Sequence, residues 1–394
     1  MRKSKRKALL GVLIIVLLVG SIGLFMKNET NTLNNSFINE ESIVEELDDN
    51  LIGAYIQQGE EYVKADTIPT SGYEFNAEES YCKIGDVVQE EMTLFYDMDT
   101  QTLTVSPIAK EGTKCYLYFD EKASAGETIL ASDNPPTGQT TDWTGGTSYY
   151  YTGNPNNWVQ FGGFWWRIIR INGNGSIRMI YQGTSANETG TGTQIGTGAF
   201  NSSSDNKTYV GLVFDGVNQH GYGTNSTIMN TLNNWYNSNL ASYEAEYIDT
   251  GTGFCSDRNT ASGDNYTDSS FHYAAYDRRH GGASLQCNSE DILSQDNRKL
   301  PNPIGLVTMD EAALTGIFTG NANKGSYLYT GQTYWTMSPY YFISNTATVF
   351  FVYDYSDVTK VSNKLGIRPV INLRGDVQLT GEGTSTNPFK VVGA

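Results

Sequence analysis

Histidine, cysteine and clustered metal ligands are scarce in this sequence. It has three histidines and four cysteines in 394 residues, with no C-x-x-C pair and no Cys/His cluster. A zinc site needs such clustered ligands, and the acidic stretches around Asp97 and Asp354 lack the spacing of a calcium loop. The sequence also lacks a phosphate-binding glycine loop, a dinucleotide fingerprint and a metalloprotease helix. We therefore expect no metal and no cofactor.

Positive charge is also in short supply. The chain has 26 Lys and Arg against 43 Asp and Glu, a formal net charge of −17. Phosphate binding depends on clustered cations, so we expect no nucleic-acid partner. The acidity itself favours solubility.

A single long hydrophobic run is present. Ala8–Phe25 contains eighteen residues without a charge, which is long enough to cross a bilayer as a helix. The basic residues before it place the N-terminus in the cytoplasm. A cleaved signal peptide is the alternative, but Ser21-Ile22-Gly23 is a poor cleavage site. A prepilin leader would have a glutamate that this helix lacks. We expect a single-pass protein of the cell membrane, anchored by residues 1–26, with the remainder outside.

Composition divides that remainder into four segments. Residues 27–50 are polar and acidic, which is typical of a solvated stalk. Residues 51–120 contain short β-type runs, which predict a small immunoglobulin-like β-sandwich. Residues 121–147 are rich in turn residues and predict a linker. Residues 148–394 predict an α+β domain with long loops.

Alternation of side chains is clearest in residues 114–119, "KCYLYF". Leu117 and Phe119 lie on one face of such a strand and the tyrosines on the other. We expect the first face to be buried, with Leu103 and Val105 opposite it.

The larger domain opens with a three-stranded meander in residues 158–181, "WVQFGGFWWRIIRINGNGSIRMIY". Its middle strand is apolar on both faces, which predicts a central strand covered on both sides. The tryptophans are therefore expected to form core rather than to contact a ligand. Arg167 and Arg170 then need polar partners or access to a sheet edge.

Two helices are indicated further along. Apolar residues recur at helical spacing in residues 226–240, behind Ser226 or Thr227 as a cap. Thr308 and Glu311 have capping-box spacing, and Gly316 can end that helix. In a following strand we expect Arg368 to be buried and paired with a carboxylate such as Glu311.

The four cysteines allow three pairings. We expect one bridge in each domain, Cys82 to Cys115 and Cys255 to Cys287, because exported chains form disulfides and each pair lies within one compositional block.

Two aromatic and polar stretches are candidates for ligand contact. "FHYAAYDRRH", residues 271–280, lies between the second pair of cysteines and would be a tethered exposed loop. "YWTMSPYYF", residues 334–342, offers aromatic faces, of which alternation turns about half toward the core. Local ion pairing and exposed loop histidines are the alternatives. The candidate residues are Tyr340, Tyr341, His272, Tyr276, Arg278, Arg279 and His280.

Several motifs together resemble one family. "NWVQFGGFWWRIIRI", "STIMNTLNNWYNSNL", "GLVTMDEAALTG", "YWTMSPYYF" and "GIRPVINLRGDVQLTGEGTSTNPF" are similar to segments of uncharacterised Firmicutes and Mollicutes surface proteins. The resemblance implies a C-type-lectin-like fold, as in sulfatase-modifying factors, for the larger domain. "SYCKIGD" and "TKCYLYF" resemble the ends of disulfide-containing β modules that precede such domains. The Glu-Pro-Asn and Trp-Asn-Asp motifs of calcium-dependent lectins do not occur in this sequence.

The leading hypothesis is a membrane-anchored surface protein, not an enzyme, whose distal domain binds an extracellular glycan or protein. One alternative is an extracytoplasmic enzyme related to sulfatase-modifying factors, with Cys255 or Cys287 as a reactive thiol. Another is a structural spacer of the cell envelope.

Overall fold

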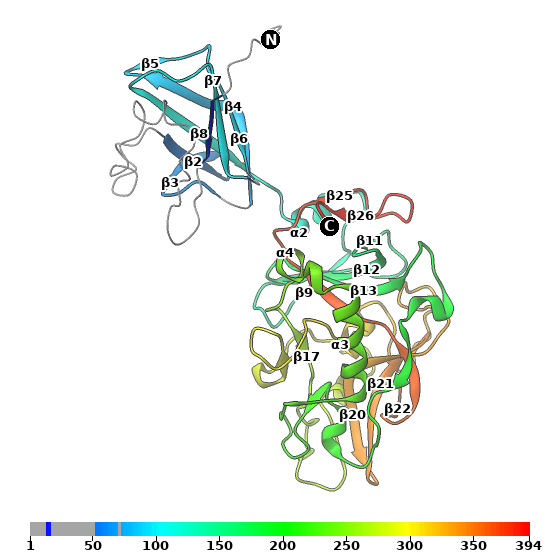
Figure 1. The fold of residues 1–394 in the computed structure, drawn as a ribbon. Coiled ribbons are helices and arrows are strands. Elements are labelled where there is room, and N and C mark those ends of the chain that lie inside the picture. Colours follow the sequence, from blue (N-terminus) through cyan, green and yellow to red (C-terminus); the bar gives the residue numbers. More distant parts are fainter. Residues whose placement is uncertain (1–12, 17–51, 70–71, 99) are drawn as a thin grey trace. The chain divides into compact units, whose positions relative to one another are not determined.

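The computed structural model describes residues 13–16, 52–69, 72–98 and 100–394 (Figure 1). They form two compact units, unit 1 up to Ala123 and unit 2 from Ser124 onward, and each is described by itself. The protein is of mixed α+β class, with many strands and few helices.

The described part of unit 1 has two β-sheets. One has the strand order β3-β2-β8-β4-β5 and the other β1-β7-β6. The strands are β1 (Leu13–Val16), β2 (Ile52–Gln58), β3 (Glu61–Ala65), β4 (Tyr73–Ile84), β5 (Val87–Val88), β6 (Thr93–Asp97), β7 (Thr102–Ser106) and β8 (Thr113–Glu121).

The alternation expected in β8 is confirmed. Leu117 and Phe119 are fully buried, and Leu103 and Val105 of β7 share their core. The Cys82–Cys115 disulfide is formed between β4 and β8 and also lies in this core. Two sheets around one core agree with the expected sandwich, whereas the immunoglobulin-like topology stays a prediction.

The expected membrane segment falls mostly outside the described residues. Of Ala8–Phe25 the structure describes Leu13–Val16, and these four residues form strand β1, paired with β7, rather than helix. Within the described ranges, no helix is long and apolar enough to cross a membrane. The stalk of residues 27–50 also lies outside the described residues. Anchor and stalk stay predictions.

Unit 2 contains two larger sheets. The eight-stranded sheet has β9 (Gly138–Thr141), β10 (Thr147–Tyr150), β11 (Trp158–Phe161), β12 (Phe164–Ile171), β13 (Ile177–Gly183), β24 (Val370–Leu373), β25 (Leu379–Thr380) and β26 (Phe389–Val391). The six-stranded sheet has β14 (Gly196–Ala199), β18 (Phe271–His272), β20 (Tyr334–Ile343), β21 (Thr346–Val352), β22 (Ser356–Lys360) and β23 (Lys364–Ile367). Two short ladders pair β15 (Val213–Phe214) with β16 (Thr224–Asn225), and β17 (Phe254–Cys255) with β19 (Ile292–Leu293).

Helices cover these sheets. The α-helices are α2 (Ala125–Leu130), α3 (Thr227–Asn239), α4 (Glu244–Tyr247), α5 (Ala275–Arg278) and α6 (Met309–Leu314). The 3-10 helices are η1 (Gly190–Thr193), η2 (Lys207–Val210), η3 (Ala241–Tyr243) and η4 (Ser289–Asp291). Both expected caps are confirmed, because the Ser226 side chain accepts from the Met229 N–H and Thr308 forms a capping box with Glu311.

The meander is confirmed as β11, β12 and β13, with β12 hydrogen-bonded on both sides. Trp166 is fully buried, and its indole N–H donates to the Phe161 carbonyl. Burying one such ring contributes about 2–3 kcal/mol. Arg167 finds its partners in the Asn157 side chain and the Pro155 carbonyl. Trp158 and Trp166 are therefore buried, as expected, whereas Phe164 and Trp165 are half-buried.

The expected linker of residues 121–147 is not a linker. From Ser124 onward it belongs to unit 2, where Ala125 and Ile129 of α2 are fully buried. The Gly145-Gly146 turn packs so closely that a Cβ on Gly146 would lie 2.1 Å from the Gly173 carbonyl oxygen. Its turn residues connect short elements of one fold rather than two folds.

A buried ion network connects the eight-stranded sheet to α6. Glu311 of α6 pairs with Arg170 of β12, 3.2 Å away, and with Arg178 of β13. Arg170 also binds Asp142 at 2.8 Å, and all four side chains are fully buried. Burial by itself would raise the pKa of Glu311, but Arg178 and Arg170 together lower it. The network is therefore charged and paired.

Glu311→Gln should lower the free energy of unfolding of unit 2 by about 3–5 kcal/mol, because it leaves buried arginines without their counter-charge. Urea denaturation followed by tryptophan fluorescence measures this, since all six tryptophans lie in unit 2. Asp376→Asn is the matched control, because the Arg374–Asp376 pair has 43% exposed side chains and should contribute less than about 1 kcal/mol. Equal losses in the two variants would contradict the account.

Candidate functional site

Four aromatic rings and one arginine from the candidate stretches gather at one place on unit 2. We call His272, Tyr276, Tyr340, Tyr341 and Arg279 the aromatic cluster. The ring centres of His272 and Tyr276 are 3.9 Å apart, those of Tyr276 and Tyr340 5.5 Å, and those of Tyr340 and Tyr341 5.1 Å. All five residues are half-buried. Each therefore keeps part of its surface for contact with a ligand.

Strand pairing brings the two stretches together. In the ladder between β18 and β20, His272 is opposite Tyr341, and the Tyr273 N–H donates to the Tyr340 carbonyl at 2.8 Å. The register between β20 and β21 shifts between Pro339 and Tyr341. Such a bulge interrupts alternation, so Tyr340 and Tyr341 are both half-exposed although they are consecutive. A regular strand would turn one of them into the core.

Tyr276 of helix α5 and Arg279, which follows that helix, complete the cluster. The guanidinium of Arg279 lies 3.7 Å from the centre of the Tyr276 ring, and its Nη1 donates to the Tyr276 carbonyl at 2.6 Å. The interaction of a cation with an aromatic face contributes about 0.5–1 kcal/mol at an exposed site. Beneath them the Tyr340 ring packs on buried Phe350, 4.9 Å between centres. Burial raises the pKa of Tyr340, so its phenol is a hydrogen-bond donor at neutral pH.

Asp264 orients the histidine of the cluster. One of its carboxylate oxygens accepts from the His272 backbone N–H at 2.6 Å and contacts His272 Nδ1 at 2.9 Å. The backbone bond is the main reason that the pKa of Asp264 is lowered. With Nδ1 at the carboxylate, Nε2 is the ring nitrogen that can face a ligand. Sequence reasoning missed Asp264, because only the fold brings its loop to β18.

Two of the seven candidates have other roles. Arg278 forms a bidentate pair with Asp310, at 2.7 and 2.9 Å, and a 2.5 Å bond to Asp257. Burial by itself would lower the pKa of Arg278, but the two carboxylates together have the larger effect and raise it. His280 is exposed, and its Nδ1 lies 3.0 Å from the Thr319 carbonyl. Ion pairing, the alternative interpretation, therefore applies to Arg278.

The stretch of residues 271–280 is only partly a loop. Phe271, Tyr273 and Ala275 are buried. The Cys255–Cys287 disulfide does enclose it, as expected. Because both cysteines are bonded to each other, neither is a free thiol. The structure therefore gives no support to the thiol chemistry of the enzyme hypothesis.

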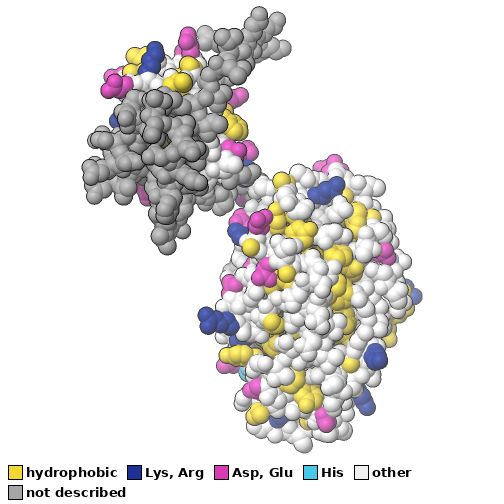
Figure 2. Space-filling view, viewed as in Figure 1, with side chains coloured by type: hydrophobic (Ala, Val, Ile, Leu, Met, Phe, Trp, Pro, Cys, Tyr) yellow, Lys and Arg dark blue, Asp and Glu magenta, His cyan; other side chains and the backbone are white. Residues whose placement is uncertain are grey.

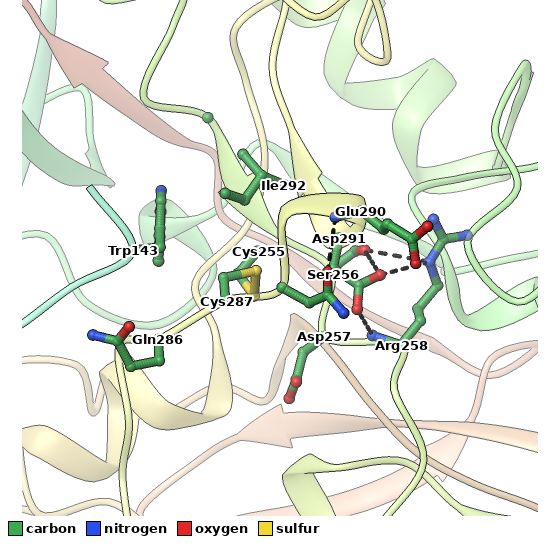
Figure 3. The surroundings of a disulfide bond; sticks show 12 residues. Trp143, Cys255, Ser256, Asp257, Arg258, Gln286, Cys287, Glu290, Asp291 and Ile292 are labelled. Atoms are coloured by element: carbon green, nitrogen blue, oxygen red, sulfur yellow. Dashed lines mark hydrogen bonds and ion pairs between the residues drawn. A yellow bond between two sulfur atoms is a disulfide. The ribbon is translucent and has the colours of Figure 1, made fainter. Parts of the chain in front are cut away.

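Hydrogen bonds between residues near this disulfide hold the two segments that it joins together (Figure 3). On one side, buried Asp291 accepts from Ser256 Oγ at 2.9 Å and from the Arg258 N–H at 2.8 Å. His220 Nδ1 also contacts Asp291, at 2.9 Å. His220 is thus part of a polar network around a buried carboxylate.

On the other side lies a small cavity of about 10 Å³, lined in part by Trp143, Cys255, Asp257 and Arg278. A space of that size holds about one water and no substrate. Burial raises the pKa of Asp257 to about 7, although Arg278 acts in the opposite direction. Its backbone has φ +48°, a left-handed conformation that costs a non-glycine residue about 1–2 kcal/mol. The cavity is therefore too small to be a ligand site. Asp257 beside it is a titrating carboxyl that pairs with Arg278 of α5.

Arg368 is fully buried, as expected, but its partner is not Glu311. It donates to the Tyr181 carbonyl, at 3.1 and 3.0 Å, and to Gln182 Oε1 at 2.7 Å. Glu311 is already bound to the arginines of β12 and β13. The prediction that Arg368 is buried is confirmed. Its predicted partner is wrong, because Arg368 lies beside Tyr181 and Gln182 of β13.

Metal ligands do not converge in the described ranges: no group of three or more His, Cys, Asp or Glu residues there could hold an ion.

Unit 2 should become more stable as the pH falls from about 8 to about 5, in part because of Asp257. The folded carboxyl takes up a proton near pH 7 and the unfolded one near about 3.9, so protonation in this window favours the folded state. The contribution is at most about 1.4 kcal/mol per pH unit. Asp257→Asn should remove this part of the pH dependence, as measured by urea denaturation at several pH values. Asp268→Asn, an exposed carboxyl, serves as control. If the difference between wild type and Asp257→Asn does not change with pH, Asp257 is ionised throughout.

No protein family model, curated protein or solved structure matches this chain. The resemblance to the Firmicutes and Mollicutes surface proteins, and the C-type-lectin-like fold that it implies, stay predictions.

Proposed function

We propose that this protein is a membrane-anchored surface protein whose unit 2 binds an extracellular glycan at the aromatic cluster. The observation that carries the proposal is the meeting of His272, Tyr276, Tyr340 and Tyr341 in one half-buried group of rings. The proposed anchor is Ala8–Phe25, and the polar residues after it are the proposed stalk. Because the structure describes Leu13–Val16 as strand β1, the proposal requires these four residues to leave that strand and form helix in the membrane.

The chemistry of the cluster favours a sugar. Apolar ring faces pack on the C–H faces of a pyranose, while phenol, imidazole and guanidinium groups bond to its hydroxyls. These polar groups are positioned before a ligand arrives, since Asp264 orients His272 and Arg279 lies over Tyr276. Such preorganisation reduces the entropy lost on binding.

Surface charge is in keeping with a neutral ligand. On the face of unit 2 that Figure 2 shows, Lys and Arg side chains are scattered rather than gathered in a basic patch. A net charge of −17 opposes binding to nucleic acid. A protein ligand remains the second candidate class, because tyrosine and arginine are also frequent in protein interfaces.

Tyr276→Ala should weaken glycan binding at least tenfold, because it removes the central ring of the cluster and the support of Arg279. The full-length chain, purified in mild detergent, is tested on an array of bacterial and host glycans and surface proteins, with and without a calcium chelator. Titration calorimetry on the positive ligands then gives affinities.

Two variants control this experiment. Tyr276→Phe keeps the ring and should retain most of the affinity, and Tyr222→Ala removes a 53% exposed tyrosine outside the cluster and should change nothing. Binding of proteins only would replace the glycan by a protein ligand. If the folded chain binds nothing, or if Tyr276→Ala binds as well as wild type, the proposal is wrong and the structural spacer is favoured.

A further inference from the structure

A groove of about 350 Å³ lies at the start of the edge strand β22. It is lined by Thr319, Gly320, Ala322, Tyr355, Ser356 and Asp357. Its volume falls at the lower end of the range of about 300–1,000 Å³ that holds small ligands. The groove is therefore large enough for a ligand group, unlike the cavity beside the disulfide.

The groove adjoins the aromatic cluster. The Thr319 N–H donates to the carbonyl of Arg279 at 3.0 Å, so one wall of the groove is hydrogen-bonded to a member of the cluster. Asp357, another residue of the lining, is near enough to the Tyr340 phenol to raise its pKa, in addition to the larger effect of burial. Two residues of the groove are thus neighbours of members of the cluster.

The lining combines one aromatic ring with oxygen atoms. Tyr355 lines the groove and is 37% exposed. Asp357 is exposed and offers a carboxylate, and the hydroxyls of Thr319 and Ser356 lie 3.4 Å apart. A ring that can stack and a carboxylate that can accept from two neighbouring hydroxyls suit a sugar residue.

The ring of Tyr355 has two aromatic neighbours. Its centre lies 6.3 Å from that of Tyr353 and 6.4 Å from that of Phe351. The hairpin behind it is fixed by the ladder between β21 and β22, in which Phe351 is opposite Asp357 and Val352 opposite Ser356.

We propose that the groove is a second saccharide subsite, which binds a further sugar residue of the glycan held at the aromatic cluster. The inference rests on the proposed function and extends it, because it assigns the protein to oligosaccharides longer than the cluster alone can cover. Stacking on Tyr355 and hydrogen bonds to Asp357 contribute the affinity of the added residue.

The test is a comparison of ligand lengths. Calorimetry measures the affinity of the full-length chain for saccharides of one to four residues from the malto-, cello- and chito-oligosaccharide series. For the series that binds, affinity should rise at least tenfold at the length that reaches the groove. Tyr355→Ala and Asp357→Asn should each remove most of this rise while leaving the affinity for the shorter oligomers within about twofold. Tyr355→Phe keeps the ring, and Tyr222→Ala is the control outside both sites.

The outcomes separate this inference from the proposed function. If short oligomers bind through the aromatic cluster but longer ones gain nothing, or if the gain survives both groove substitutions, the second subsite is wrong and the glycan site stands. If none of the three series binds, the inference fails for these sugars, and the array result decides the fate of the proposed function by itself. If Tyr276→Ala leaves the affinity for every oligomer unchanged while the groove variants lower it, the groove is the primary site. Both the glycan site at the aromatic cluster and the second subsite are then wrong.

Discussion

The buried pairing of Glu311 with Arg170 and Arg178 is the interaction on which the rest of unit 2 depends. It connects two central strands of the eight-stranded sheet to α6, and no solvent reaches these side chains. Charges so deeply buried are tolerated only when each has a partner, so the network fixes where α6 lies. The Met309 N–H also donates to Ser338 Oγ of β20 at 2.9 Å, which connects α6 to the second sheet. Helix α6 is therefore the joint between the two sheets.

The neighbouring residue in the sequence extends this joint to the surface. Asp310 binds Arg278 of α5 with two hydrogen bonds and accepts from the Ser284 N–H at 2.9 Å. Because α5 also carries Tyr276 and leads to Arg279, the aromatic cluster is connected to the core through two consecutive acidic residues. A ligand site on a short helix of four residues needs such support, since a helix of that length is not stable by itself.

Local patterns in the sequence predicted local features well. The meander, the caps of α3 and α6 and the alternation in β8 each depend on neighbours a few residues apart, and each is confirmed. Most of the candidate ligand residues also meet in the structure, because β18, at the start of one aromatic stretch, pairs with β20, which contains the other. What failed depends on long-range packing. The partner of Arg368, the role of residues 124–147, the contribution of Asp264 and the groove beside Tyr355 all follow from which segments the fold places side by side, and no spacing in the sequence encodes that.

The most direct test of the central claim is a crystal structure of the protein with a bound tetrasaccharide from the series of highest affinity. The account predicts one sugar residue in contact with the Tyr341 ring and with His272 Nε2, a further residue stacked on Tyr355, and little movement of α5 relative to the unbound protein. A sugar bound on another surface of the protein, with the rings of the cluster in contact only with each other, would contradict it.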